Sequence, residues 1–277
     1  NGNLDANGNP CPSGDCRYSR PGDRKDRYEN LSFYLGYIRP LNDSLNFVAH
    51  GTQGFRAPQA TELYRLQQTQ TLAKLDPEEL LSVEAGFRFQ GDTLSGELIA
   101  YAMKKRNVIL QTDDRQNVSD GQTDHKGIEF NVTWQLSEHF ALHSQGSYAK
   151  HQYSENVGSL SIDGNEIDTA PKRTASVQLQ WKPNTKSVVE IEWRHIGEYY
   201  LDPANEHLYE GHDLINLRLK HKLTDKMWLA LRVNNLADTD YAERADFVDF
   251  NGIVDPADFR YFVGEPRSVY GELGLSF

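Results

Sequence analysis

The C-terminal end of the chain alternates strictly between apolar and polar side chains. In an extended conformation one side would carry Val269, Gly271, Leu273, Leu275 and Phe277, and the other Ser268, Tyr270, Glu272, Gly274 and Ser276. Successive side chains of a strand point to opposite faces, so this segment has one apolar face and one polar or small face. A strand that faces lipid on one side and an aqueous interior on the other requires this pattern. A soluble sheet with one buried face also produces it.

The same alternation recurs along the chain and predicts about eleven strands. The apolar positions fall at residues 31–37, 45–49, 81–89, 94–100, 128–134, 140–148, 175–181, 189–193, 215–219, 229–233 and 269–277. Short turns, at 40–43, 90–92, 135–138, 183–186 and 223–226, alternate strictly with long polar loops, which include residues 54–76 and 242–262. Outer-membrane barrels have short turns at one end and long loops at the other, and about 9–11 residues cross the bilayer. We therefore predict an all-β chain that forms a transmembrane antiparallel β-barrel.

Aromatic and charged residues fit the same arrangement. Trp134 and Trp181 lie beside short turns, and Tyr148, Tyr199 and Tyr200 lie near long loops, which are the places of interfacial aromatic girdles. Charged residues at the alternate positions are predicted to face the interior and to pair there, because unpaired buried charge is costly. They are Glu84, Arg88, Glu129, Glu190, Glu192, Arg194, Arg218, Lys220, Arg232 and Glu272.

The N-terminal residues 1–27 read as a long loop that precedes the barrel portion, residues 28–277. The two cysteines, Cys11 and Cys16, enclose a turn-like Pro-Ser-Gly segment and predict a local disulfide in an oxidising compartment. Two free thiols are the alternative. The first predicted strand runs from the long-loop side to the short-turn side, whereas a complete barrel has an even number of strands and begins on the inner side. We therefore expect a C-terminal portion of a longer barrel.

Several classes of function are disfavoured. A net charge of −11 opposes binding to the phosphate backbone of nucleic acids. No run approaches the roughly 20 apolar residues of a spanning helix. No phosphate-binding loop, nucleophile elbow or catalytic Cys–His arrangement is present, so no enzyme is predicted. His139 and His143 lack the further ligands that zinc requires, and no metal site or cofactor is predicted.

Four motifs, in order along the chain, resemble the barrels of TonB-dependent outer-membrane receptors. They are Gly-Phe-Arg-Ala-Pro at 54–58 with Glu-Leu-Tyr at 62–64, Leu-Asp-Pro-Glu at 75–78, Val-Asn-Asn-Leu-Ala-Asp at 233–238 with Tyr241, and Gly-Glu-Pro-Arg at 264–267 before a strand that ends at Phe277. The resemblance covers residues 28–277. It implies a bacterial outer-membrane barrel of about 22 strands, of which this chain holds the C-terminal half, and a plug domain absent from it. Phe277 would be the terminal signal for barrel assembly.

The resemblance also implies energised uptake of a scarce ligand, most often a ferric chelate carried as cargo rather than as a cofactor. Its implied partners are outer-membrane lipid, the remaining strands and plug, a TonB-type energy-transducing protein and a small-molecule ligand. Haem receptors of the family usually place a histidine in the first motif, and residues 59–74 contain none, which disfavours haem. A ferric siderophore is expected from the frequency of ligands in the family rather than from particular residues. Arg56, Tyr64 and Arg65 are the candidate ligand contacts, and a structural role for Arg56 is the alternative. A passive porin-like barrel and a secreted β-rich lectin or enzyme remain the competing interpretations.

Overall fold

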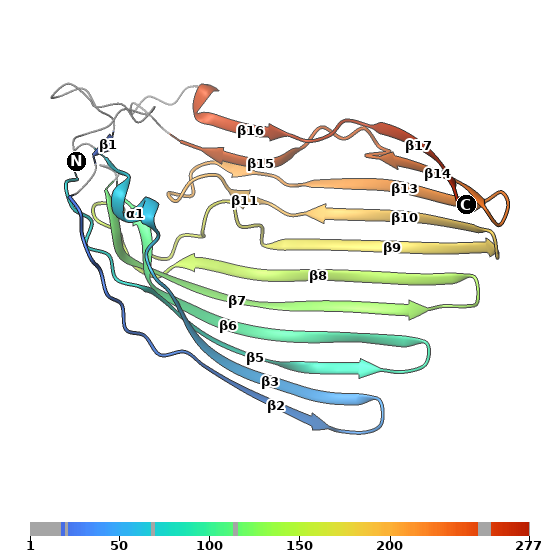
Figure 1. Ribbon diagram of the computed structural model, residues 1–277, viewed down its shortest axis with the longest axis horizontal. Helices are drawn as coiled ribbons and strands as arrows, with labels where there is room; N and C mark the ends of the chain where they lie inside the picture. The colour runs from blue at the N-terminus through green and yellow to red at the C-terminus, as the bar shows by residue number, and fades with distance from the viewer. Residues whose placement is uncertain (1–17, 20–21, 68–69, 113–115, 249–255, 277) are drawn as a thin grey trace.

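One large antiparallel sheet forms the body of the protein. The computed structural model describes residues 18–19, 22–67, 70–112, 116–248 and 256–276. The sheet has eleven strands in the order β17-β14-β13-β10-β9-β8-β7-β6-β5-β3-β2, so each strand pairs with its neighbours along this series (Figure 1). The sheet is not closed within this chain, and β2 and β17 are its edges. The predicted all-β fold and the eleven strands are confirmed.

The smaller elements lie in the long connections between strands of the large sheet, except β1, which precedes them. The large sheet consists of β2 (Phe33–Pro40), β3 (Leu45–Arg56), β5 (Glu78–Gln90), β6 (Leu94–Gln111), β7 (Asn117–Gln135), β8 (Phe140–Tyr153), β9 (Arg173–Asn184), β10 (Ser187–Ile196), β13 (His212–Lys222), β14 (Met227–Asn234) and β17 (Ser268–Leu275). The smaller elements are β1 (Tyr18–Ser19), α1 (Ala60–Tyr64), β4 (Leu66–Gln67), β11 (Tyr199–Tyr200), β12 (Leu208–Tyr209), β15 (Ala242–Phe247), η1 (Pro256–Asp258) and β16 (Phe259–Val263). No helix within the described ranges is long and apolar enough to span a membrane.

The short turns lie where the sequence predicts them, and polar side chains close them. The Asn42 side-chain oxygen accepts hydrogen bonds from the backbone N–H groups of Ser44 and Leu45, both at 2.9 Å. The Asn184 side chain does the same for Lys186, at 2.9 Å. Such local side-chain bonds substitute for the missing backbone pairing of a tight turn. All long connections consequently lie at the opposite end of the sheet (Figure 1).

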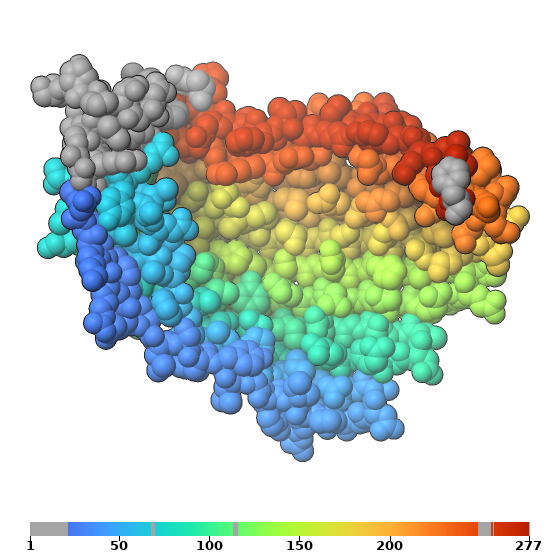
Figure 2. All heavy atoms as spheres, viewed as in Figure 1, coloured from blue at the N-terminus to red at the C-terminus, as the bar shows by residue number. Residues whose placement is uncertain are grey.

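The register separates an apolar face from a polar face. Phe47 pairs with Phe87, Phe87 with Leu98, and Leu98 with Phe130, so four apolar side chains form one row across four strands. This face is open, and Leu98 is 51% exposed. On the other face Arg218 donates to Glu190 at 2.6 Å and to Glu192 at 3.4 Å. Figure 2 shows the sheet curved and hollowed along its length. The apolar face is the lipid-facing outer wall and the polar face is the inner wall.

Of the five predicted girdle residues, three are exposed as expected, Tyr200 is half-buried in β11 and Tyr199 is buried. Trp134 and Trp181 near the short turns, and Tyr148 near the long loops, are all exposed on the outer wall. Tyr199 is instead 5% exposed. Its hydroxyl accepts the backbone N–H of Ala245 at 3.0 Å. The girdle prediction is wrong for Tyr199 because Ala242 and Ala245 of β15 pack against it.

The long loops are more ordered than the sequence predicts. The predicted loop at 54–76 contains α1 and β4, and the predicted loop at 242–262 contains the paired strands β15 and β16. β6 and β7 have 18 and 19 residues, well beyond the length that crosses a bilayer. Their outer-wall residues become charged at Lys104 and Lys126, which marks where the strands leave the lipid. Cys11, Cys16 and Phe277 lie outside the described residues, so the disulfide and the terminal assembly signal stay predictions.

Candidate ligand-binding site

Arg56 joins three elements at the long-loop end of the sheet. From the last residue of β3, its Nε donates to Glu78 Oε2 at 2.8 Å, and its two terminal nitrogens donate to the Glu62 carboxylate at 3.1 and 3.0 Å. Glu62 lies in α1 and also accepts the backbone N–H of Gln59, which caps the helix. Glu78 begins β5 and also accepts the backbone N–H of Ile109 on β6. A guanidinium with two carboxylate partners is geometrically fixed.

The charges of this cluster compensate one another. The two carboxylates raise the pKa of Arg56 above its ordinary value. Burial alone would raise the pKa of Glu78, but the bonds from Arg56 and from the Ile109 N–H outweigh it and lower that pKa. Both groups lie beyond the lipid-facing residues of their strands. Arg56 therefore shapes the loop in this structure, which favours the structural alternative for it.

Tyr64 and Arg65 lie next to this cluster at the end of α1. The Tyr64 hydroxyl donates to the backbone carbonyl of Arg24 at 3.3 Å. Its ring packs on the buried cluster formed by Leu63, Leu66, Ala73 and Leu75. Arg65 follows the helix as an exposed residue. The structure thus brings the three candidate contacts to one loop, and their role in ligand binding stays a prediction.

The motif at 233–238 is also a structural device. Asn235 is 2% exposed and has a positive φ of 49°. Its side-chain oxygen accepts the Thr239 N–H at 2.9 Å, and its side-chain nitrogen donates to the Thr239 carbonyl at 2.8 Å. Its backbone N–H donates to Asn216 at 2.9 Å. Asparagine tolerates the left-handed region and satisfies the turn with its amide, so this residue fixes the exit of β14.

The motif at 264–267 packs against Tyr241. A Cβ added to Gly264 would lie 2.2 Å from the Tyr241 ring, so only glycine allows this approach. The Tyr241 hydroxyl accepts the backbone N–H of Glu265 at 3.2 Å. The Glu265 carboxylate accepts bonds from Ser268, Tyr270 and Asn234, and these three donors lower its pKa to about 2. The two C-terminal motifs thus form one polar cluster at the outer ends of β14 and β17.

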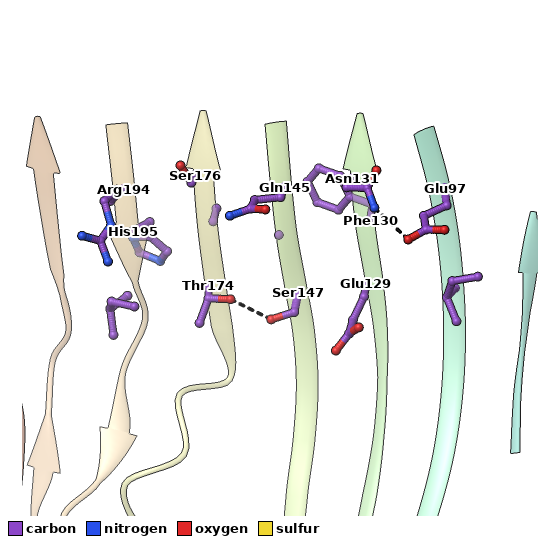
Figure 3. A pocket seen from close by; sticks show the side chains of 14 residues that line it. Glu97, Glu129, Phe130, Asn131, Gln145, Ser147, Thr174, Ser176, Arg194 and His195 are labelled. Atoms are coloured by element: carbon purple, nitrogen blue, oxygen red, sulfur yellow. Dashed lines mark hydrogen bonds between the residues drawn. The ribbon is translucent and has the colours of Figure 1, made fainter. Parts of the chain in front are cut away.

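A polar depression of about 430 Å³ lies in the middle of the inner wall (Figure 3). Its lining comes from β6 to β10 and includes Glu97, Glu129, Asn131, Gln145, Ser147, Thr174, Ser176 and Arg194. Asn131 donates to Glu97 at 2.8 Å, and the Ser147 and Thr174 hydroxyls are 2.8 Å apart. Neither Glu129 nor Arg194 forms an ion pair with another described residue. The depression therefore offers a cation, a carboxylate and several hydroxyl or amide groups to a polar ligand.

The sequence predicts part of this surface. Glu129 and Arg194 are predicted to face the interior, and both line the depression (Figure 3). Gln145, Ser147 and Thr174 are missed because an isolated polar residue on a strand carries no signal. They become recognisable only when the strand register shows that they lie close together on adjacent strands. Among the described residues no three or more His, Cys, Asp or Glu side chains group as metal ligands.

A family model described as "TonB dependent receptor-like, beta-barrel" matches residues 5–236. The chain belongs to this family of outer-membrane transport receptors. The recognition made from the four motifs is thereby confirmed, as is the location in the bacterial outer membrane. The match ends shortly after Asn235, so the cluster around Gly264 and the last strand lie beyond it.

Individual relatives are distant and longer. An uncharacterised TonB-dependent receptor of Haemophilus influenzae is 27% identical over 182 residues, which are 60% of this chain and 52% of the relative. The metal-pseudopaline receptor CntO of Pseudomonas aeruginosa is 22% identical over 259 residues, which are 88% of this chain and 33% of the relative. The chain thus spans about half or less of the length of these curated relatives.

Solved structures show the same fold. The ferric-catecholate import receptor Fiu of Escherichia coli K12 superposes with a TM-score of 0.72 and 18% identity, over 97% of this chain and 38% of that receptor. At this identity the likeness establishes the barrel fold and nothing finer. The family match excludes the competing interpretation of a secreted soluble sheet.

Proposed function

We propose that this chain forms the C-terminal barrel wall of a receptor that takes up a ferric siderophore with energy from the inner membrane. The family match carries the proposal, because receptors with this barrel are transporters. The ligand class is supported by a similar sequence, a metal-pseudopaline receptor, and by similar structures, which include receptors for ferric yersiniabactin and ferric catecholates. The absence of a histidine from residues 59–74 argues against haem.

The inner wall supplies groups that suit such a ligand. A ferric chelate presents oxygen-rich, often anionic surfaces, and these accept hydrogen bonds from guanidinium, hydroxyl and amide groups. Arg194 extends into the depression without an ion-pair partner among the described residues, and Ser147 and Thr174 lie nearby (Figure 3). Arg194 is therefore our candidate for an inner-wall ligand contact. It complements the loop contacts predicted at Tyr64 and Arg65.

In the proposed mechanism the protein binds and gates but makes or breaks no bond of the ligand. The outer loops and the inner wall capture the chelate from the external medium. A plug domain in the intact receptor then rearranges when a TonB-type protein pulls on it, and the chelate passes through the barrel. The inner wall described here is the fixed surface against which that movement occurs.

Uptake of radioactive iron by cells that depend on the intact receptor tests the function. Iron is supplied as a catecholate, a hydroxamate or a citrate chelate, with and without an uncoupler of the proton gradient. We expect one chelate class to be accumulated and the uncoupler to abolish accumulation. Uptake that persists with the uncoupler would identify a passive barrel instead.

A pair of arginine variants tests the contact. Arg194→Gln should weaken chelate binding about tenfold or more, because a hydrogen bond to a charged group contributes about 1.5–3 kcal/mol. Arg218→Gln is the matched control, since Arg218 is on the same wall but is neutralised by Glu190 and Glu192. Equal binding by native and Arg194→Gln receptors would remove Arg194 from the site.

A further inference from the structure

A row of three metal-binding side chain types crosses the inner wall above the depression. Met103 on β6 is the register partner of His125 on β7, and His125 is the register partner of His151 on β8. Residues directly opposite in antiparallel strands have Cβ atoms about 4.5–5.5 Å apart and point to the same face. One thioether and two imidazoles therefore stand side by side on three adjacent strands.

The two imidazoles are already in contact. The Nδ1 atoms of His125 and His151 are 2.8 Å apart, and the ring centroids are 5.0 Å apart. A hydrogen bond between two ring nitrogens requires one of them to be an unprotonated acceptor. The pair therefore holds at least one free nitrogen lone pair directed at its neighbour, which is the arrangement that a bridging cation can exploit.

Thr123 orients one of these rings. Its hydroxyl oxygen lies 2.9 Å from His125 Nε2. When Nε2 carries the proton and donates it to Thr123, the Nδ1 atom of His125 is left bare. Ligand histidines in metal sites are commonly held in this way by a bond to the second ring nitrogen. Thr123 thus acts as a positioning residue for His125.

The spacing fits coordination after a small movement. A metal bonded to two imidazoles lies about 2.0–2.1 Å from each nitrogen, and at the angles of about 110–120° of a three-coordinate ion the two nitrogens are then about 3.3–3.6 Å apart. The observed separation is 2.8 Å. Rotating the two rings so that the nitrogens separate by roughly 0.5–0.8 Å would admit the ion.

The ligand types select the metal. A thioether is a soft ligand that favours Cu(I), and imidazole also binds copper well. Hard Fe(III) prefers oxygen, so this row does not suit the proposed cargo. Lys105, in the next row beside Thr123, adds a positive charge and disfavours a divalent ion relative to a monovalent one.

We propose that Met103, His125 and His151 form a copper(I) site on the inner wall. The site is separate from the ferric-chelate surface and does not depend on it. Copper would be three-coordinate, with two nitrogens and one sulfur, and the ligands come from three strands that the backbone hydrogen bonds already hold in register.

Copper(I) titration of the intact receptor in detergent, under reducing and oxygen-free conditions, tests the proposal. A chromophoric copper(I) chelator serves as competitor, and copper X-ray absorption reports the ligand atoms. We expect one tightly bound ion with a nitrogen and sulfur shell. His125→Gln and His151→Gln should weaken binding at least 100-fold. Met103→Leu should weaken it at least tenfold and remove the sulfur shell while leaving zinc(II) affinity within twofold.

His143→Gln is the matched control, because His143 lies on the same strand as His151 and hydrogen-bonds only to Thr133 among described residues. It should bind copper(I) like the native receptor. Native-like binding by Met103→Leu and His125→Gln, or an equal loss in His143→Gln, would overturn the proposal. Heat-modifiable gel migration verifies that each variant has folded. Iron uptake is measured in parallel, so that failure of the copper site and failure of the siderophore function are seen separately.

Discussion

The lipid-embedded part of the sheet and its outer end are stabilised in different ways. Within the part of the chain that the structure describes, the three clusters of buried apolar residues all lie among the long loops and the outer strand ends. They centre on Leu66, on Leu201 with Tyr199, and on Val157 with Tyr153. In the lipid-embedded part the large apolar side chains are exposed on the outer wall instead, as Leu98 and Leu273 illustrate.

This difference shows that the bilayer takes the place of a packed protein layer on the outer wall. In the outer loops apolar side chains leave water by packing against one another, as in any soluble domain. In the lipid-embedded part the apolar side chains contact lipid, so the sheet needs no second protein layer to cover them. The charged residues then turn to the inner wall, where Arg218 joins Glu190 and Glu192. The alternating pattern thus places apolar side chains in lipid on one face and polar side chains in the aqueous interior on the other.

The largest effect should come from a cavity in the outer loop. Leu66 is fully buried among Leu63, Ala73 and Leu75. Leu66→Ala should cost about 2–5 kcal/mol of local stability. Limited proteolysis should therefore cleave residues 57–77 faster, while heat-modifiable migration of the barrel stays unchanged. Leu72→Ala is the control, because Leu72 is 47% exposed in the same loop. Simultaneous loss of barrel and loop would contradict the separation of the two parts.

A charge placed in lipid should act on the barrel itself. Leu98 lies near the middle of the lipid-facing row formed by Phe47, Phe87 and Phe130. Leu98→Arg should lower the free energy of unfolding by about 2–4 kcal/mol, the cost of arginine near the bilayer midplane. Urea unfolding in lipid vesicles measures it. Ile99→Arg, on the inner wall beside the depression, should cost clearly less; similar costs would mean that the two walls are assigned wrongly.

Removing Arg56 should loosen the junction between the two parts. Arg56→Gln leaves Glu62 and Glu78 facing each other without a cation. The expected cost is about 1–3 kcal/mol, reduced by solvent screening because the Arg56 side chain is 37% exposed. Hydrogen exchange should quicken at the Ile109 amide, which donates to Glu78. Lys74→Gln, an exposed change in the same loop, should leave it slow. Unchanged exchange with weakened ligand binding would instead support Arg56 as a ligand contact.

The smallest effect concerns pH at the C-terminal motif. The pKa of Glu265 is lowered to about 2 by bonds from Ser268, Tyr270 and Asn234, from an ordinary value near 4.5. A lowered carboxyl pKa contributes stability that is complete above the ordinary value and is lost as the pH falls towards 2. Glu265→Gln should therefore be less stable than native protein near neutral pH and equal to it near pH 2. Thermal unfolding at several pH values measures the difference; a difference that does not vary with pH would rule out this role.

Much of the barrel wall could be predicted from the sequence because strands and tight turns depend on residues that are neighbours in the sequence. A period of two and tight-turn residues such as Asn42 and Asn184 define the strands one hairpin at a time. The loops could not be predicted in this way. Tyr199 follows a strand and resembles a girdle residue, yet a contact with Ala245, 46 positions away, buries it. Arg56 likewise meets Glu78, on the far side of the loop, because β3 and β5 pair in register.

The sequence by itself determined the all-β class, the two faces of the sheet and the family, since alternation and motif order are properties of neighbouring residues. Only the tertiary structure decided which residues act together. Glu129 and Arg194 share a depression, and Met103, His125 and His151 share a row, because the register of separate strands sets those distances. Register depends on the geometry and length of the turns and loops between strands as well as on alternation, so the pattern within one strand does not give it.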